Sequence, residues 1–359
     1  MAVTIVHPTP RDLGYRFPAE WHKHRATWLS YPHEDSYSWP GTLPKIFPYY
    51  NSFIKEISLG EQVCINVRNE DLKEKVFRDL AAIGVDMGRI DLLVHPTNDA
   101  WCRDHGPAFL LNNKAGAPKV AVSWKYNAWG DKYPHDLDEC IPALAAGVLG
   151  IPVYHPGIVM EGGAVDFNGD GTLLTTTSCL LHKNRNPLLD RDEITDYLVN
   201  FYGVEQVLWL GEGIEGDDTN GHIDDMTRFF RPDGVITMVE PNRGDPNHRI
   251  LEENLKKLKQ FRLLNGKQIE IAELPMPEPV VFEGQRLPAS YANFYICNQA
   301  VIVPLFRCQQ DEQAVRILEQ CFPTHKVVGI DSVEIIWGLG SWHCLSQQEP
   351  EVNSELAGY

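Results

Sequence analysis

The chain has 359 residues, of which 43% are hydrophobic and 23% are charged, and its 32 Lys and Arg against 49 Asp and Glu give a formal net charge of −17. A chain of this length and composition buries a large core, so disordered and fibrous proteins are excluded. The negative charge disfavours nucleic acids and anionic membranes as partners and favours a cationic ligand. No long apolar run and no leader-like start is present, which predicts a soluble, cytoplasmic protein.

The predicted elements form a repeat when they are taken in chain order. Four β-hairpins are predicted, and after each hairpin come a helical pattern and then a further strand. Examples are the helices at 246–263 and 311–321 and the strands at 206–210 and 269–274. The unit of hairpin, helix and strand recurs about every 55 to 70 residues, and such units normally pack against their neighbours. The four hairpins are expected at 108–111 with 120–124, 164–167 with 172–175, 226–230 with 235–238, and 293–297 with 300–303.

Two predicted strands near the ends of the chain have no local hairpin partner. They span 27–31 and 342–346. Pairing them would complete a fifth unit, close the units into a ring and remove exposed sheet edges. We therefore predict a single domain over residues 1–359, with an open mixed α/β sheet as the alternative.

The eight cysteines are scattered, with no Cys-x-x-Cys pair and no zinc-like Cys/His spacing. Most are expected to be buried thiols in a reducing compartment. Cys344 follows Gly338-Leu339-Gly340-Ser341-Trp342-His343. Neighbours on a strand point to opposite faces, so a base for Cys344 should come from elsewhere than His343.

The densest polar segment is 216–225, Gly-Asp-Asp-Thr-Asn-Gly-His-Ile-Asp-Asp. On an extended segment His222 and Asp224 project to the same face, which places a base beside a carboxylate. One alternative is a solvated acidic loop. Another is a metal site formed by His222, Asp224 and either Asp217 or Asp218, although no second histidine cluster completes a familiar set of ligands.

Two shorter motifs stand directly before the first and second hairpins. Trp101 and Asp104 in the segment 98–107 would suit a cation with an alkyl tail, although a packed indole and a turn carboxylate are also possible. Glu161-Gly162-Gly163 holds the same place before the second hairpin. Glycines there most often mark a sharp bend of the backbone.

Together these residues resemble the agmatine deiminase family, often labelled peptidylarginine-deiminase-like in bacteria. The resemblance implies an α/β fold of five blades, a propeller of the pentein type, and it implies a hydrolase without cofactor or metal that often forms homodimers. The matching segments run in order over most of the chain: Trp101-x-Arg103-Asp104-x-Gly106-Pro107, Glu161-Gly162-Gly163, Gly216-Asp217-Asp218-Thr219-x-Gly221-His222-Ile223-Asp224, and His343-Cys344 followed by Gln347-Gln348.

The resemblance also implies roles for individual residues. Cys344 would be the nucleophile and His222 the general acid and base. Asp104 and Asp224 would bind the guanidinium, Trp101 would pack beside the alkyl chain, and Arg103 would be structural. The distal amine of the substrate would be held by Glu161, Asp217 or Asp218.

The resemblance predicts hydrolysis of agmatine to N-carbamoylputrescine and ammonia. Deimination of free or peptidyl arginine is the closest alternative, but acids rather than an Arg or Lys stand beside the motifs, which favours agmatine. A metal-dependent hydrolase and a non-catalytic binding propeller are further alternatives. Leu339 and Trp342 replace smaller residues that are typical of the family, so we expect them to alter the rim of the pocket.

Overall fold

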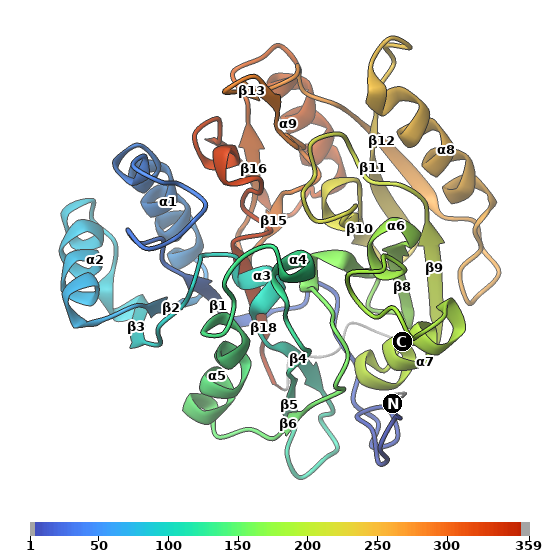
Figure 1. Cartoon of the computed structure of the whole chain (residues 1–359), viewed down its shortest axis with the longest axis horizontal. Coiled ribbons are helices and arrows are strands. Elements are labelled where there is room, and N and C mark those ends of the chain that lie inside the picture. The colour runs from blue at the N-terminus through green and yellow to red at the C-terminus, as the bar shows by residue number, and fades with distance from the viewer. Residues whose placement is uncertain (1–3, 353–359) are drawn as a thin grey trace.

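A computed structural model describes residues 4–352 of the chain. The strands are divided among separate small sheets, and the units that contain them follow one another around the molecule in chain order (Figure 1). The longer helices lie on the outside and the sheets lie towards the middle (Figure 1). The predicted alternative of one open sheet is therefore wrong for the part of the chain described.

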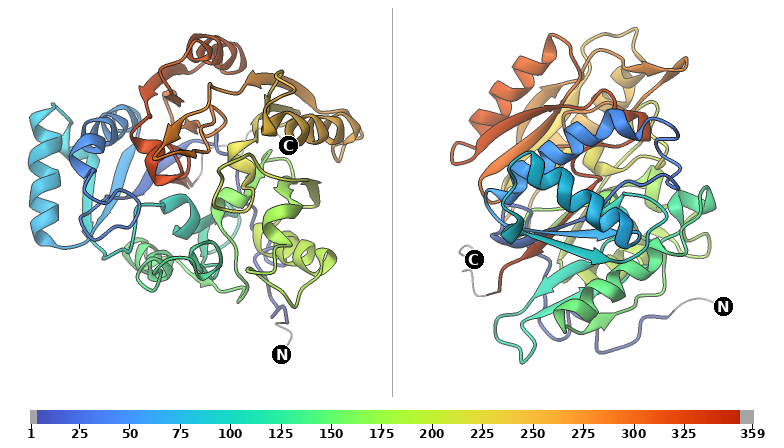
Figure 2. Two further views of the ribbon diagram at one scale, coloured as in Figure 1. Left: turned by 45° about the horizontal axis from the view of Figure 1, so that its top comes forward. Right: turned by 90° about the vertical axis from the view of Figure 1, so that its left-hand side faces the viewer.

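The first unit combines both ends of the chain. Its sheet has the strand order β18-β1-β2-β3. In both views of Figure 2 its two blue helices lie side by side on one side of this sheet. Its elements are β1 (His24–Ser30), α1 (Leu43–Ser58), β2 (Gln62–Val67), α2 (Glu70–Ala82), η1 (Met87–Arg89), β3 (Ile90–Val94) and β18 (Ser346–Pro350).

The second and third units each begin with a short helix and a β-hairpin. The second unit contains α3 (Cys102–His105), β4 (Ala108–Leu111), β5 (Lys119–Val122), α4 (Ala128–Asp131), η2 (Asp138–Cys140), α5 (Ile141–Leu149) and β6 (Val153–Tyr154). The third unit contains η3 (Gly162–Ala164), β7 (Val165–Phe167), β8 (Thr172–Thr176), α6 (Thr177–Leu180), α7 (Arg191–Tyr202) and β9 (Gln206–Leu210).

The fourth and fifth units follow the same plan. The fourth contains η4 (Ile223–Asp225), β10 (Thr227–Arg231), β11 (Gly234–Val239), α8 (Pro246–Gln260) and β12 (Glu270–Pro275), and the small hairpin β13 (Val281–Phe282) with β14 (Gln285–Arg286) follows it. The fifth contains β15 (Tyr295–Ile296), β16 (Ala300–Leu305), α9 (Gln310–Cys321), β17 (Lys326–Asp331) and η5 (Ile335–Gly338).

Each unit from the second to the fifth pairs its first two strands antiparallel and its third strand parallel to the second. Parallel strands need a crossover, and here a helix supplies it. All four predicted hairpins are confirmed, as are the two helices and the two strands given above as examples. Helix α8 ends at Gln260 rather than near residue 263, because Phe261 is extended and Leu263 pairs with Lys267 in a turn.

The predicted pairing between the two ends of the chain is also confirmed. Strand β1 lies antiparallel to β18, with Trp28 opposite Gln347 and Leu29 opposite Ser346. The predicted C-terminal strand nevertheless begins too early. Residues 342–345 form a turn, in which Ser346 N donates to His343 O (3.0 Å), and the strand begins only at Ser346.

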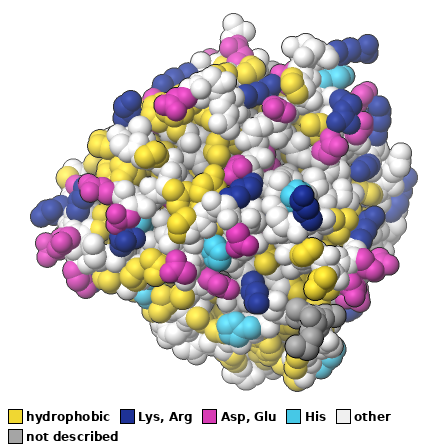
Figure 3. All heavy atoms as spheres, in the orientation of Figure 1, with side chains coloured by type: hydrophobic (Ala, Val, Ile, Leu, Met, Phe, Trp, Pro, Cys, Tyr) yellow, Lys and Arg dark blue, Asp and Glu magenta, His cyan; other side chains and the backbone are white. Residues whose placement is uncertain are grey.

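Within residues 4–352, no helix combines the length and the apolar character that crossing a membrane requires. Acidic and basic side chains are interspersed over the face shown in Figure 3, so the net charge of −17 is not gathered into one patch there.

Candidate active site

The residues of the candidate site occupy equivalent places in different units. Each lies directly before the strand that opens its hairpin, or before β18, which takes this place in the first unit. Asp104 precedes β4, Gly163 precedes β7, His222 and Asp224 precede β10, and Cys344 precedes β18. The repeat therefore carries residues distant in sequence to one place.

Asp104 is held through both of its carboxylate oxygens. It is 5% exposed. Its Oδ1 accepts a hydrogen bond from Gly163 N (2.9 Å), and its Oδ2 accepts one from Trp129 Nε1 (2.9 Å). Burial raises the pKa of Asp104 to about 6, against the opposing influence of His222. Asp104 is consequently ionised for the most part at neutral pH.

His222 faces two of the predicted acids. Its Nδ1 lies 3.7 Å from Asp104 Oδ1 and 3.9 Å from Asp224 Oδ1. Burial disfavours the imidazolium, but the Asp104 charge and the nearby Cys179 thiol raise the pKa of His222 well above its ordinary value. The expected proximity of His222 and Asp224 is present, yet the expected extended backbone is wrong, because residues 223–225 form the 3₁₀ turn η4.

Gly163 allows these three groups to meet. A Cβ at this position would lie 2.6 Å from His222 Nδ1, 2.9 Å from Asp104 Oδ1 and 3.0 Å from Asp224 Oδ2. Any larger residue would therefore fill the space between them. The sequence predicted a bend of the backbone at this glycine pair. In the structure, the missing side chain of Gly163 lets His222, Asp104 and Asp224 approach one another closely.

Cys344 lies in the turn before β18 and is 5% exposed. Its Sγ is 3.6 Å from Asp224 Oδ2 and 3.0 Å from Asn293 Nδ2. Burial and the charges of Asp224, Asp225 and Asp104 raise the pKa of the Cys344 thiol well above its ordinary value. A nearby positive charge is needed before the thiolate can form readily.

Asn293 is a site residue that sequence reasoning missed. Its Oδ1 accepts hydrogen bonds from Ser341 Oγ (2.9 Å), His343 N (3.1 Å) and Cys344 N (3.3 Å), and so fixes the turn that carries the thiol. Asn293 stands directly before β15, the place that the other units use for the site. Its place before the predicted hairpin, equivalent to that of the other site residues, is the sequence signal that could have identified Asn293.

His343 links Asp224 to the interior of the protein. Its Nδ1 lies 2.7 Å from Asp224 Oδ2, and its Nε2 lies 2.8 Å from Glu20 Oε2. Although burial opposes ionisation, the hydrogen bond and charge of His343 lower the pKa of Asp224. His343 was not assigned a role from the sequence, because its bond to Asp224 joins residues 119 positions apart.

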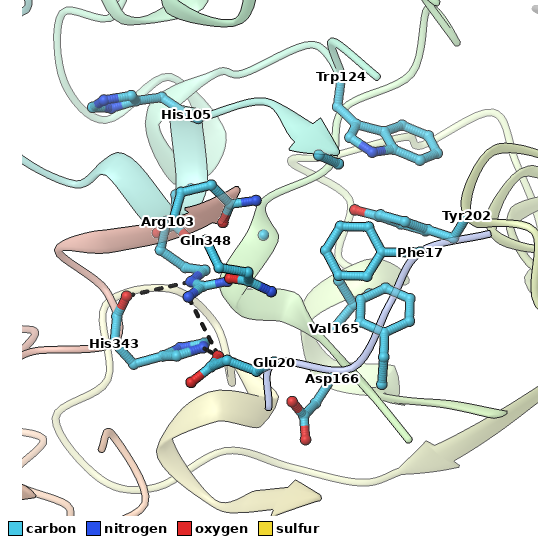
Figure 4. Close-up of a pocket in the computed structure, with 16 residues that line it drawn as sticks. Phe17, Glu20, Arg103, His105, Trp124, Val165, Asp166, Tyr202, His343 and Gln348 are labelled. Carbon is cyan, nitrogen blue, oxygen red and sulfur yellow. Dashed lines mark hydrogen bonds and ion pairs between the residues drawn. The ribbon is translucent and has the colours of Figure 1, made fainter. Parts of the chain in front are cut away.

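Behind the site, Glu20, Arg103 and His343 line a small cavity of about 20 Å³ (Figure 4). The guanidinium of Arg103 donates to His343 O (3.3 Å), Glu20 Oε2 (3.4 Å) and Gln348 Oε1 (2.7 Å). Arg103 thus contacts protein groups, in agreement with a structural role.

A second cavity of about 140 Å³ gives access to the site. Asp104 and Cys344 line it, and so do Asp218 and Leu339. The other large side chains of its wall are aromatic: Tyr37, Trp101, Trp129, Tyr133 and Trp337. Trp101 was predicted to lie beside a substrate chain, and its position in this wall is compatible with that role.

The three acids proposed for the distal amine lie in different surroundings. Asp218 lines the cavity, but it also contacts Lys132 Nζ (2.9 Å) and Tyr133 OH (3.0 Å). Glu161 is buried, with its Oε1 2.5 Å from Arg185 Nε.

Asp217 holds its own loop. Its Oδ1 accepts from Thr219 N (2.7 Å) and its Oδ2 accepts from His222 N (3.0 Å). Of the three acids, Asp218 is therefore the one that faces the cavity.

The surroundings of the site differ from the sequence prediction at the basic residues and at Trp342, and agree with it at Leu339. Basic residues do stand beside the motifs, because Lys132 contacts Asp218 and Arg185 contacts Glu161. Trp342 does not form the rim, since it is fully buried and stacks on Phe53 with 4.7 Å between ring centroids. Leu339 does line the cavity.

Two clusters in the described chain have the composition of metal ligands. One contains Glu161, Cys179 and His222, and the other contains Asp224, Asp225 and Cys344, with the ligand atoms of each within 4.8 Å of one another. Neither is the set suggested by the sequence.

A family model described as Porphyromonas-type peptidyl-arginine deiminase matches residues 16–350. The chain belongs to this family. A relative from Legionella pneumophila named "Putative agmatine deiminase" is 34% identical over 351 residues, which cover 96% of this chain and 98% of the relative. The resemblance drawn from the motifs is thereby confirmed.

Two solved structures are similar over nearly the whole chain. The agmatine deiminase of Enterococcus faecalis matches with a TM-score of 0.90 and 29% identity, covering 98% of this chain and 100% of that chain. A cysteine-to-serine variant of the C. jejuni agmatine deiminase with substrate bound matches with a TM-score of 0.86 and 30% identity, covering 94% and 97%. The family member described here shares their α/β fold.

Proposed function

We propose that this chain is an agmatine deiminase, a hydrolase that converts agmatine and water to N-carbamoylputrescine and ammonia. One observation carries the proposal: Cys344, His222, Asp104 and Asp224 lie close together, and Asp104 and Cys344 of this group line an aromatic-walled cavity. Asp224 Oδ1 is buried and has no hydrogen-bond partner among the described residues, so it is open to a donor from a ligand. The names of the relatives support the same activity.

The two acids suit a guanidinium group. A buried cation must be offset by carboxylates, and planar pairs of N–H groups match carboxylate oxygens in bidentate fashion. Asp104 Oδ1 and Asp224 Oδ1 lie 3.7 Å and 3.9 Å from the same atom, His222 Nδ1. They would bind the cation and orient its carbon towards Cys344.

The substrate charge would also activate the nucleophile. The surrounding acids disfavour the Cys344 thiolate, and a guanidinium held between them reverses the local sign of charge. The thiol proton is released to solvent as the cation binds, and the Cys344 thiolate attacks the guanidinium carbon. His222 gives its proton to the departing nitrogen, the C–N bond breaks and ammonia leaves. The product of this half-reaction is an amidino group joined to Sγ through a C–S bond.

Hydrolysis completes the cycle. His222, now neutral, takes a proton from water while the water oxygen attacks the amidino carbon. The C–S bond breaks, the remaining hydroxyl proton passes to the sulfur as the ureido carbonyl forms, and the product leaves with Cys344 again a thiol and His222 again protonated.

We further propose that the five sheets are the blades of a closed propeller of the pentein type. The pairing of β1 with β18 supports this arrangement, because it joins the last strand to the first unit. Closure would fix the five loops of the site relative to one another.

Free arginine is the second candidate substrate, and a specific contact favours it. Lys132 lies beside Asp218 at the cavity and could meet a substrate carboxylate. Lys132→Ala should lower activity on arginine much more than activity on agmatine if arginine is the substrate. Equal effects would favour agmatine.

Ammonia release from agmatine, arginine and a blocked arginine peptide tests the proposal. We expect agmatine to have the highest kcat/KM and Cys344→Ser to remove the activity. Cys140→Ser is the matched control, because Cys140 is exposed and is not one of the residues that line the cavity. Normal turnover by Cys344→Ser, or loss of activity with a chelator, would contradict this mechanism.

A further inference from the structure

Four consecutive residues beside the cavity have left-handed backbone conformations. Their φ angles are 44° at Ala128, 59° at Trp129, 104° at Gly130 and 58° at Asp131. Only glycine adopts this region without steric cost, so three residues of this turn are held in an unfavourable conformation. A conformation of this kind persists only where surrounding contacts fix it, and such strain gathers at functional sites.

Contacts from a neighbouring loop fix the turn. The carbonyl of Trp129 accepts from Asn184 Nδ2 (3.2 Å) and from the Arg185 guanidinium (3.1 Å). Asn127 Oδ1 accepts from Gly130 N (3.0 Å). A Cβ at Gly130 would lie only 2.2 Å from Asn184 Nδ2, so the two segments are in direct contact.

Arg185 joins this turn to the loop that carries His222. It also donates to Thr219 O (2.7 Å) and to Asn220 Oδ1 (2.7 Å), and it forms the ion pair with Glu161. One buried side chain therefore holds both loops beside the cavity in a fixed relation.

The result of this arrangement is the position of one indole. The Trp129 ring lines the cavity, and its Nε1 donates to Asp104 Oδ2 (2.9 Å). Gly163 N occupies the other oxygen of the same carboxylate. With a donor on each oxygen, the Asp104 carboxylate cannot rotate freely, and its remaining lone pairs keep one direction.

We infer that Trp129 is a positioning residue, whose strained turn holds its indole N–H against Asp104 and thereby orients that carboxylate for a guanidinium. This inference rests on the proposed function. It assigns Trp129 a role that the resemblance did not carry, and it explains why the chain maintains the left-handed turn at 128–131.

The electrostatic consequence can be measured. Burial raises the pKa of Asp104 to about 6. His222 opposes this rise, whereas the charges of Asp224 and Glu161 add to it. Removal of a donor that stabilises the carboxylate raises its pKa further. Since the guanidinium binds the ionised acid, the fall of kcat/KM on the acid side should begin at a higher pH.

Trp129→Phe tests the inference, because it keeps an aromatic ring and removes the N–H. We expect kcat/KM at pH 7 to fall about tenfold or more, as for a lost hydrogen bond to a charged group, mainly through a higher KM. The acid limb of the pH profile should move upwards by about half a unit or more. Trp209→Phe is the matched control, because Trp209 is equally buried, lies on β9 and packs against Arg191 away from the cavity. The pH profile of kcat/KM in this variant should equal that of the unchanged enzyme.

Asn184→Ala provides a second variant if Trp129→Phe does not fold. Asn184 is half-buried and touches the turn rather than Asp104, so a smaller shift of the acid limb in the same direction would support the inference. An unmoved acid limb in Trp129→Phe, or in Asn184→Ala where only that variant folds, would overturn it. Wild-type turnover in the same assay tests the proposed function separately, because that function can hold while the acid limb stays in place.

Discussion

At the scale of single residues, the candidate site depends on how buried charges are balanced. Asp104 and Asp224 are both buried, yet burial raises the pKa of Asp104, whereas the contact with His343 lowers the pKa of Asp224. Asp224 therefore stays ionised over a wide pH range, while Asp104 titrates near pH 6. The contact with His343 distinguishes the two acids, and Glu20 Oε2 lies 2.8 Å from the other ring nitrogen of His343.

Glu20→Gln should reveal this balance as a loss of stability. Glu20 Oε2 lies 2.8 Å from Arg228 Nη2 and 3.4 Å from Arg103 Nη2, and all three side chains are buried. An amide leaves the two guanidiniums without their shared counter-charge, so denaturant unfolding should show a loss of about 3–5 kcal/mol.

Glu205→Gln is the matched control for Glu20→Gln. Glu205 pairs with Arg16 at 3.4 Å, but both side chains are about half exposed. Such surface pairs contribute about 1 kcal/mol or less. A Glu20→Gln variant as stable as this control would contradict the role given to Glu20.

At the scale of elements, the hairpins could be predicted because their signals are local. Turn formers such as Pro232-Asp233-Gly234 stand between apolar runs, and the structure places β10 and β11 around them. The segment before Cys344 could not be predicted in this way. Its N–H groups at 343 and 344 donate to Asn293, about 50 residues away, so no local pattern shows that the strand begins only at Ser346.

Leu339, between η5 and the Cys344 turn, also has a left-handed conformation, with φ 73°. Its side chain lines the cavity. Leu339→Gly should relieve backbone strain of about 1–2 kcal/mol while losing a partly buried side chain of similar value, so stability should change little. The wider cavity should raise kcat/KM for the blocked arginine peptide relative to agmatine.

Arg307→Gly serves as the control for Leu339→Gly. Arg307 has a similar left-handed φ of 58°, but it is exposed and pairs with Asp331 and Glu334 outside the cavity. The ratio of peptide to agmatine activity should not change in this variant. If Leu339→Gly also leaves that ratio unchanged, Leu339 does not select the substrate.

At the scale of the whole molecule, the repeat explains both what the sequence predicted and what it missed. Motifs with several informative residues, such as those around Asp104 and His222, could be identified in the sequence. Asn293, Trp129 and Glu20 stand in segments without such motifs. Their contacts with Cys344, Asp104 and His343 join residues 51, 25 and 323 positions apart. Their roles depend on the packing of the repeated units, which brings loops distant in sequence to one thiol.

The most direct test of this account is mass spectrometry of the enzyme quenched in acid during turnover of agmatine. The account predicts that the peptide containing Cys344 gains the mass of agmatine minus ammonia, while the other seven cysteines remain unmodified. Turnover without any adduct, or an adduct on a different cysteine such as the buried Cys179 beside His222, would contradict the central claim that Cys344 is the nucleophile.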